Sequence, residues 1–220
     1  MYIHFFKRFF DVIFSLVSLI ILCIPFIIIA SLIKLESKGP VMFKQNRIGI
    51  NGNTFKIYKF RSMYMTAPHD AATNSLEHAD EMITIIGRIL RKSSIDELPQ
   101  FINVLKGEMS IIGPRPVICT ENELITLRHN NGAETVLPGL TGLAQVHGRD
   151  HVPNLQKAQY DGIYAASVSF MTDFKLVIRT IWYVFLHIGI HEGKHKNKSV
   201  VVNSELEDAN LVDMKKSKVN

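Results

Sequence analysis

The chain has 220 residues, of which 47% are hydrophobic and 20% charged, and its 25 basic and 20 acidic residues give a net charge of +5. This composition excludes an acidic disordered chain, a collagen-like fibre and a coiled coil, and the length fits one globular unit with accessory segments. Two cysteines, Cys23 and Cys119, are too few for a disulfide scaffold, so we expect reduced thiols in a reducing compartment.

The first predicted element is an apolar segment of membrane length. Residues 12–33 carry no charged side chain, and a helix of about 20 apolar residues crosses the ~30 Å core of a bilayer. Pro25 interrupts this helix, because proline lacks a backbone donor and clashes with the carbonyl of Ile21. Basic residues flank the segment on both sides, so the positive-inside rule favours a re-entrant helix broken at Pro25. An ordinary transmembrane anchor is the alternative.

Short extended runs follow the apolar segment. Residues 41–44 and 54–60 are separated by a turn that contains Asn51-Gly52, which predicts a β-hairpin. Residues 62–80 lose periodicity and collect small and polar side chains, so we expect a long mobile loop there.

Seven basic residues and one acidic residue, Glu36, lie between positions 34 and 61. This basic stretch suits anionic headgroups and lipid phosphate. A nucleic-acid patch is the alternative, but the sequence has no recognisable recognition helix or aromatic platform for bases, so we expect no nucleic-acid partner.

The middle of the chain alternates between helical patterns and rigid turns. Apolar spacing predicts helices at 81–91, 96–105 and 121–129, and Gly113-Pro-Arg-Pro116 predicts a rigid turn that no helix tolerates. Residues 138–149 hold three glycines and one proline, which predicts a tightly turned loop around a short strand.

The last ordered element predicted is an amphipathic helix at 169–190. Its apolar positions share one helical face: Phe174, Ile178, Ile181, Trp182 and Phe185. Such a helix lies flat in the membrane interface, and a helix packed on the domain core is the alternative. Residues 191–220 carry few large apolar side chains and predict a disordered tail.

The candidate chemistry lies at Asp96-Glu97. One interpretation is structural, because Ser94-x-x-Glu97 matches a capping box that only starts a helix. The other is functional. A carboxylate in a first helical turn is kept ionised by exposed N–H groups, as a nucleophile or metal ligand requires. Arg88 and Arg91 lie just upstream, where they could bind a phosphate beside a divalent metal.

Four motifs carry a resemblance to a known family. They are K-R-F-F-D at 7–11, F-K-I-Y-K-F-R-S-M at 55–63, S-I-D-E-L-P-Q-F-I-N-V-L-K-G-E-M-S-I-I-G-P-R-P at 94–116 and P-G-L-T-G-L-A-Q-V-H-G-R at 138–149. In this order they resemble the bacterial sugar transferases, small monotopic phosphoglycosyl transferases. The usual small residue before the proline of the membrane helix is replaced by Ile24.

The resemblance implies roles for named residues. Asp96 is expected to be the nucleophile and Glu97 its partner in the catalytic dyad, with both as ligands of a Mg²⁺ cofactor. Guanidinium groups bind phosphate in a bidentate manner, so we expect Arg91 and Arg115 to contact phosphate. Lys59 and Arg149 are further candidates from their motifs, with solvated surface charges as the alternative.

The resemblance also implies a fold and an activity. We expect an α+β fold with a re-entrant membrane helix at 1–35, a small, mainly helical catalytic domain at 36–190 and a tail at 191–220. The expected reaction moves a sugar 1-phosphate from a UDP-sugar to polyprenyl (undecaprenyl) phosphate and releases UMP, through an aspartyl phosphosugar intermediate. This would be the first membrane step in assembly of a glycan such as exopolysaccharide or lipopolysaccharide, on the cytoplasmic face of a bacterial inner membrane.

The alternatives are a catalytically silent, membrane-anchored scaffold or interaction module of a glycan pathway, and a phosphatase with an aspartyl-phosphate intermediate, whose usual D-x-D motif is absent. The sugar and the oligomeric state stay open.

Overall fold

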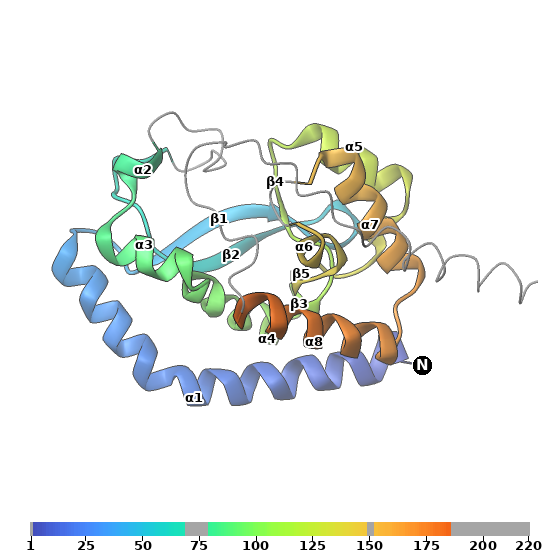
Figure 1. The fold of residues 1–220 in the computed structure, drawn as a ribbon, viewed down its shortest axis with the longest axis horizontal. Helices are drawn as coiled ribbons and strands as arrows, with labels where there is room; N and C mark the ends of the chain where they lie inside the picture. Colours follow the sequence, from blue (N-terminus) through green and yellow to red (C-terminus); the bar gives the residue numbers. More distant parts are fainter. Residues whose placement is uncertain (1, 69–78, 149–151, 186–220) are drawn as a thin grey trace, which may run out of the picture.

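The computed structural model describes residues 2–68, 79–148 and 152–185 (Figure 1). Its α-helices are α1 Lys7–Glu36, α2 Ala79–Met82, α3 Ile85–Lys92, α4 Phe101–Lys106, α5 Asn122–Asn130, α6 Leu143–Val146, α7 Asn154–Ala166 and α8 Phe170–Phe185. Its strands are β1 Met42–Ile48, β2 Thr54–Phe60, β3 Ser110–Ile112, β4 Val117–Ile118 and β5 Gly139–Thr141. Short helices of other types cover η1 Tyr2–Phe6, η2 Ile50–Gly52, η4 Ile95–Gln100 and η5 Ala133–Thr135. The predicted α+β class with mainly helical content is confirmed.

Two small sheets form the centre of the fold. The first has the strand order β2-β1-β4, and the predicted hairpin is confirmed with a longer first strand than expected. Its turn places Asn51 at φ 53° and Gly52 at φ 76°, a left-handed conformation that asparagine and glycine tolerate. In the second sheet β3 pairs in parallel with β5, with Ser110 opposite Gly139. This pairing brings the Gly113–Pro116 turn beside the glycine-rich loop.

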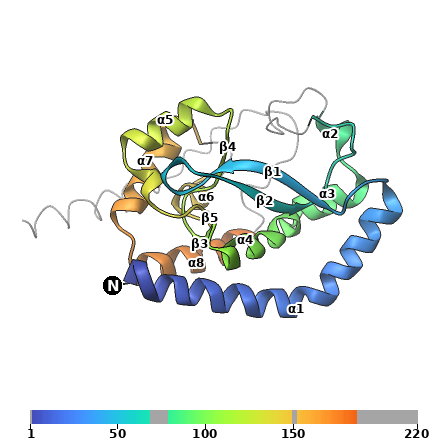
Figure 2. The same ribbon diagram turned by 180° about the vertical axis from the view of Figure 1, so that it is seen from behind.

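Helix α1 is bent but continuous. Figures 1 and 2 show it running beneath α8 and α4 and then turning towards the start of β1. The predicted break is therefore a bend, because helical geometry continues through Pro25. A proline removes one backbone hydrogen bond and crowds the preceding turn, and a bend relieves that crowding without ending the helix.

Charged residues at the start of α1 bond three different elements of the body. Lys7 Nζ forms an ion pair with Asp173 Oδ2 on α8 at 2.7 Å. Arg8 donates to two carbonyls at the C-terminal end of α4. Asp11 Oδ1 accepts from the backbone N–H of Ile111 in β3 at 3.0 Å. The K-R-F-F-D motif therefore fixes the N-terminal end of α1 to α8, α4 and β3.

The C-terminal end of α1 is fixed to the same body. Glu36 accepts from the backbone N–H groups of Ile85 and Ile86, the first residues of α3. Arg61 is only 4% exposed and donates to the carbonyls of Ser37 and Lys38. Arg61 is therefore buried and is not available to lipid headgroups, unlike what its place in the basic stretch 34–61 suggested.

Apolar side chains are exposed along α1 and α8, which lie side by side in Figures 1 and 2. The predicted apolar face of α8 is exposed at Phe174, Ile178, Ile181 and Trp182. Within the described residues, α1 is the helix whose length and composition would allow it to cross a membrane, with a mean hydropathy of 3.1 over a stretch of 18 residues. Residues 186–190 of the predicted amphipathic segment lie outside the described residues.

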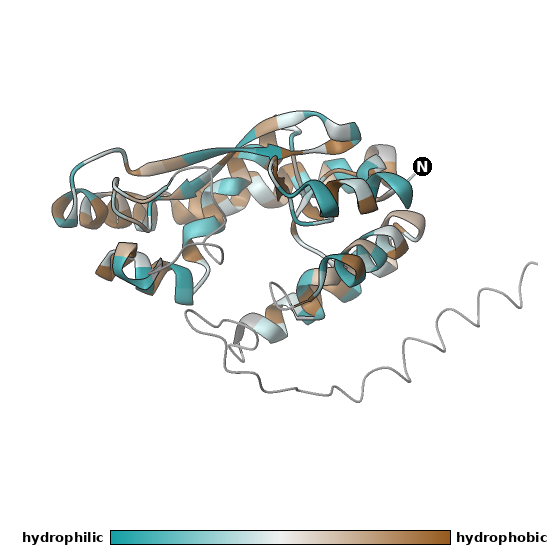
Figure 3. Ribbon diagram, turned by 90° about the horizontal axis from the view of Figure 1, so that it is seen from above, coloured by the Kyte–Doolittle hydropathy of each residue, from teal (hydrophilic) through white to brown (hydrophobic). Residues whose placement is uncertain are grey.

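Helix α7 was missed by the sequence analysis. It packs against α5 and α6 and buries Ala158, Asp161 and Tyr164. Figure 3 shows hydrophobic and hydrophilic residues mixed around the helices that cover the strands, as expected for helices with one face towards a core. One cluster of buried apolar residues joins α7 to β3, α6 and α8: Ile112, Val146, Tyr164 and Leu176.

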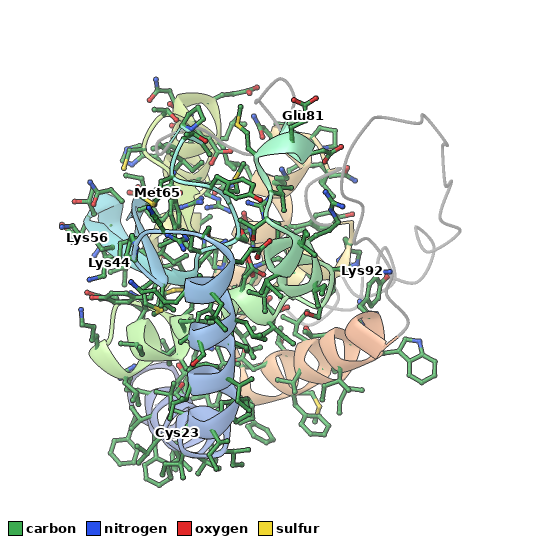
Figure 4. The ribbon with its side chains drawn as sticks, turned by 90° about the vertical axis from the view of Figure 1, so that its left-hand side faces the viewer. Cys23, Lys44, Lys56, Met65, Glu81 and Lys92 are labelled. Carbon is green, nitrogen blue, oxygen red and sulfur yellow. The ribbon has the colours of Figure 1, made fainter. Side chains whose placement is uncertain are left out.

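Two predicted segments, a loop and a tail, fall largely outside the described residues. Most of the predicted loop 62–80 and all of the tail 191–220 lie outside the described residues. Cys23, on α1 (Figure 4), and Cys119 are free thiols, as predicted.

We predict that Asp11→Ala destabilises the fold, because the N–H of Ile111 then loses its acceptor inside the protein. The expected cost is about 1–3 kcal/mol in free energy of unfolding, measured as a lower midpoint of thermal unfolding in detergent. Asp11→Asn retains an acceptor oxygen and is expected to lose less. Asp80→Ala, at an exposed position of α2, is the matched control. Equal midpoints for Asp11→Ala and the control would contradict the role given to Asp11.

Candidate functional site

The candidate site begins at the sharp turn between α3 and η4. Ser94 lies there at φ 57°, in the left-handed region, and its side chain makes no capping hydrogen bond to η4. The capping-box interpretation is therefore wrong. The carboxylate of Glu97 points to other partners, and the turn directs the side chains of η4 towards the sheet.

Glu97 is held between two cations from distant segments. Lys59 Nζ, on β2, lies 2.7 Å from Glu97 Oε1. Arg115, in the Gly113–Pro116 turn, donates through Nη2 to Oε1 at 2.7 Å and through Nη1 to Oε2 at 3.3 Å. Burial alone would raise the pKa of Glu97, but Arg115 and Lys59 together hold it well below its usual range. Glu97 is therefore a charged carboxylate with two cationic partners.

Asp96 differs from its neighbour in both burial and partners. Asp96 is 8% exposed. Within the described ranges its carboxylate takes part in no hydrogen bond or ion pair. Burial, followed by the negative charge of Glu97, raises the pKa of Asp96 to about 6, while Lys59, Arg91 and Arg115 oppose the rise. The pKa of Asp96 is therefore raised and not lowered, although Asp96 lies in the first turn of η4, a six-residue 3₁₀-helix. Lys59, Arg91 and Arg115 limit the rise, because their positive charges favour the ionised form of this carboxylate.

Of the residues predicted to bind phosphate, Lys59 and Arg115 contact Glu97. The others differ in how near they lie to the two carboxylates. Arg91 donates through Nε to Ser62 Oγ at 2.8 Å, and its charge acts on Asp96. Arg88 is exposed on α3 and makes no hydrogen bond with either carboxylate. Arg149 lies outside the described residues.

Two arginines that support the site were not identified from the sequence. Arg47 of β1 donates to the carbonyl of Pro116 at 3.1 Å, and burial together with the charge of Arg115 lowers the pKa of Arg47 to about 10. Arg128 of α5 donates to the carbonyl of Arg115 at 2.8 Å. The sequence marks both only as basic residues, since a buried arginine is recognised by its tertiary contacts.

Positive charge exceeds negative charge around the dyad. Four cations, Arg47, Lys59, Arg91 and Arg115, lie in this network of charges with three carboxylates, Asp96, Glu97 and Glu121, the last of which acts on Arg47. The excess remains when all three carboxylates are ionised. Such a site attracts phosphate groups, and guanidinium and ammonium groups are the side chains that bind them.

Asp96 and Glu97 are also the side chains that could hold a divalent cation. Among the residues described, no group of three or more His, Cys, Asp or Glu side chains forms a complete protein site. Mg²⁺ is commonly bound through one or two carboxylates, with waters and substrate phosphates as the remaining ligands. The adjacent carboxylates therefore fit Mg²⁺ as a partial set of ligands.

This chain is similar to known sugar transferases and exopolysaccharide production proteins. The family model "Bacterial sugar transferase" matches residues 2–187. The exopolysaccharide production protein ExoY of Sinorhizobium fredii is 38% identical over 200 residues, which cover 83% of this chain and 87% of ExoY. The uncharacterized sugar transferase EpsL of Bacillus subtilis is 39% identical over 193 residues, covering 86% of this chain and 92% of EpsL.

A longer relative shares the same region. The UDP-glucose:undecaprenyl-phosphate glucose-1-phosphate transferase of Klebsiella pneumoniae is 40% identical over 194 residues, which cover 83% of this chain and 40% of that protein. This chain thus spans less than half the length of the Klebsiella enzyme. The family match covers α1 to α8 and includes the Asp96–Glu97 pair. The chain belongs to the bacterial sugar transferases, a family of enzymes.

Proposed function

We propose that this protein transfers a sugar 1-phosphate from a UDP-sugar to polyprenyl phosphate and releases UMP. Relatives support this reaction class by their names. Those from Klebsiella pneumoniae and Escherichia coli are named UDP-glucose:undecaprenyl-phosphate glucose-1-phosphate transferases. One from Aeromonas hydrophila is named for transfer from UDP-N-acetylgalactosamine. The sugars differ among them, so the proposal concerns the class of UDP-sugars.

The observation that carries the proposal is the contrast between two adjacent carboxylates. Glu97 is neutralised by Lys59 and Arg115 at 2.7 Å, whereas the Asp96 carboxylate has no such partner in the described part of the chain. An ionised carboxylate without hydrogen bonds retains its lone pairs for attack on phosphorus. Glu97 fixes the two cations beside that nucleophile, where phosphate charge has to be stabilised.

The chemistry divides into two displacements. In the first, an oxygen of Asp96 bonds to the phosphorus that carries the sugar, the bond from that phosphorus to the UMP oxygen breaks, and UMP leaves with the electron pair. In the second, a phosphate oxygen of the polyprenyl phosphate bonds to the same phosphorus and the Asp96 carboxylate leaves. The carboxylate is regenerated, and no proton is gained or lost by Asp96. Two steps avoid holding two phosphate substrates in the site at once.

The residues around Asp96 have separate tasks in this scheme. Arg115 and Lys59 bind the phosphoryl oxygens and hold Glu97, and Arg91 faces Asp96 from the end of α3. Asp96 and Glu97 would hold Mg²⁺, which when bound supplies further positive charge to the phosphate oxygens.

The attachment of α1 supports a re-entrant path in the membrane. Both ends of the helix are bonded to one body, through Lys7 and Asp11 at one end and Glu36 at the other. A helix that spans the bilayer separates its ends by about 30 Å of hydrocarbon, which is incompatible with these contacts. We therefore infer that α1 enters and leaves on the cytoplasmic face of a bacterial inner membrane, with α8 in the interface.

A catalytically silent scaffold would share this fold and membrane attachment. It would have no use for a buried carboxylate that lacks a hydrogen-bond partner in the described structure, because burying such a charge is costly. The substitution of Asp96 distinguishes the two functions.

We predict that Asp96→Asn lowers the rate of UMP release by more than about 1000-fold, because the amide cannot act as the nucleophile. The measurement uses detergent-solubilised protein, Mg²⁺, undecaprenyl phosphate, and UDP-glucose and UDP-N-acetylgalactosamine as donors. Thermal unfolding serves as the control for folding. UMP release by Asp96→Asn at the wild-type rate would exclude the nucleophile, and a wild type that neither releases UMP nor forms a phosphosugar adduct on Asp96 would favour the scaffold.

We predict that Lys59→Ala lowers kcat/KM for the UDP-sugar by about 100-fold, the usual effect of losing one donor to a developing oxyanion. Lys56→Ala is the matched control: it removes the same charge from the same strand, and Lys56 lies on the outer side of the hairpin (Figure 4). We expect the control to stay within about twofold of wild type. Similar losses in both variants would indicate an effect of net charge alone.

We predict that Pro25→Leu straightens α1 and moves part of the population into a spanning orientation. The readout is labelling of an Ile3→Cys variant, in a chain with Cys23→Ser and Cys119→Ser, by an impermeant maleimide added outside intact spheroplasts. With Pro25 present Ile3→Cys is expected to stay unlabelled, and with Pro25→Leu a labelled fraction is expected. External labelling with Pro25 present would refute the re-entrant path.

A further inference from the structure

The turn that carries Arg115 is held through its backbone carbonyls. Tyr164 Oη donates to the carbonyl of Ile112, just before the turn, at 3.0 Å. The backbone N–H of Gly139 donates to the carbonyl of Pro114 at 2.8 Å. The next two carbonyls accept from guanidinium groups of Arg128 and Arg47. Both prolines of the turn lack a backbone donor, and the N–H of Gly113 donates to the carbonyl of Thr141 at 2.8 Å, so the Arg115 end of the turn is attached to the body through carbonyls.

Arg115 itself depends on this attachment. Its side chain is 40% exposed although it binds Glu97, which is 20% exposed. Its two N–H···O bonds to Glu97 require the plane of the guanidinium to face the carboxylate, so their geometry depends on where the Arg115 backbone starts. A shift of the Arg115 backbone would therefore move its guanidinium away from Glu97.

The donor to the Arg115 carbonyl is fixed by an ion pair behind the turn. Arg128 donates through Nε and Nη2 to Asp161 Oδ2 at 2.9 and 2.6 Å, and its Nη1 points to the carbonyl of Arg115 at 2.8 Å. Arg128 is 8% exposed and Asp161 is 1% exposed. Arg128 comes from α5 and Asp161 from α7, so the pair connects both helices to the turn.

Stability alone does not account for this pair. Removing two charges from water is costly, and apolar residues of similar size are often as good in the same place. The second oxygen of Asp161 has no hydrogen-bond partner among the described residues, so the pair is not even fully satisfied. What the pair supplies that apolar residues cannot is a donor of fixed direction, aimed at one carbonyl.

We propose that Arg128, held by Asp161, is a positioning residue for catalysis: it sets the backbone of Arg115 so that the Arg115 guanidinium meets Glu97 and the substrate phosphate. The inference deepens the proposed function, since it rests on Arg115 as a phosphate-binding residue. The Arg128–Asp161 ion pair between α5 and α7 then supports the phosphate site. Neither helix contributes a side chain to the Asp96–Glu97 dyad.

The test uses a variant that retains folding. Arg128→Met alone would leave the buried carboxylate of Asp161 uncompensated, so the main variant is the double change Arg128→Met with Asp161→Leu, which replaces the pair by apolar side chains. The matched control is Asn131→Ala. Asn131 donates to the carbonyl of Ala158 at 2.6 Å and so joins α5 to α7 without contacting the turn.

The first readout does not need turnover. Phenylglyoxal modifies accessible arginines, and peptide mass spectrometry gives the rate at Arg115. We expect the Arg128→Met/Asp161→Leu variant to be modified at Arg115 several-fold faster than wild type, because Arg115 leaves Glu97 more often, and we expect Asn131→Ala to match wild type. An unchanged rate in the paired variant, or an equal increase in Asn131→Ala, overturns the proposal whether or not the protein is active on the donors tried.

The second readout is a double-mutant cycle in kcat/KM for UMP release, with UDP-glucose and UDP-N-acetylgalactosamine as donors. Arg115→Ala is expected to lose about 100-fold, and the paired variant about 10-fold. In the Arg115→Ala background, Arg128→Met/Asp161→Leu should lower kcat/KM by no more than a further factor of about two, because the effects of coupled residues are not additive. Full additivity would mean that the pair acts independently of Arg115. Absence of turnover in wild type with both donors counts against the proposed function, and the labelling result then decides the positioning role.

Discussion

The site depends on the charged carboxylate of Glu97. This carboxylate has to stay ionised although it is partly shielded from water. A desolvated carboxylate is costly unless cations meet it at hydrogen-bond distance. Those cations come from β2 and from the Gly113–Pro116 turn, which are far apart in the chain, and the carboxylate comes from η4. One ion-pair cluster thus joins three segments, and each segment is in turn fixed by its own contacts. Asp96, the next residue, takes its place from this cluster and remains without a partner of its own in the described structure.

Polar contacts also determine how the membrane helix α1 is attached to the rest of the protein. Charged side chains at both ends of α1 find partners on the body rather than in the solvent, Lys7, Arg8 and Asp11 at one end and Glu36 at the other. The buried Arg61 of the body in turn donates to the carbonyl of Ser37, just after the helix. The apolar surface of the helix between its two ends is left exposed. Polar contacts therefore specify where the helix begins and ends, and apolar surface specifies only that the part between them avoids water.

The sequence predicts those parts of the fold that depend on local pattern. The hairpin follows from its turn residues, the amphipathic α8 from its period, and the Asp96–Glu97 pair and Arg115 from motifs. Sequence reasoning failed where the outcome depends on tertiary contacts. Ser94 and Glu97 have the spacing of a capping box, yet the cations outcompete the backbone for the carboxylate. Arg47 and Arg61 look like members of a basic surface stretch, but their burial follows from carbonyls that only the folded chain brings to them. Helix α7 lacks a strong apolar period, because its buried face includes Asp161.

The bend in α1 has a consequence for the lipids in which the protein can work. A helix that crosses a bilayer has to match its thickness, and hydrophobic mismatch then tilts the helix or deforms the membrane. On the proposed path, α1 meets a single leaflet, and both of its ends are fixed relative to Asp96 by contacts within the protein. The height of Asp96 above the hydrocarbon is then a property of the fold and not of the bilayer. The enzyme would keep its reach to the headgroup level as acyl chains lengthen or shorten, where a spanning anchor would be displaced.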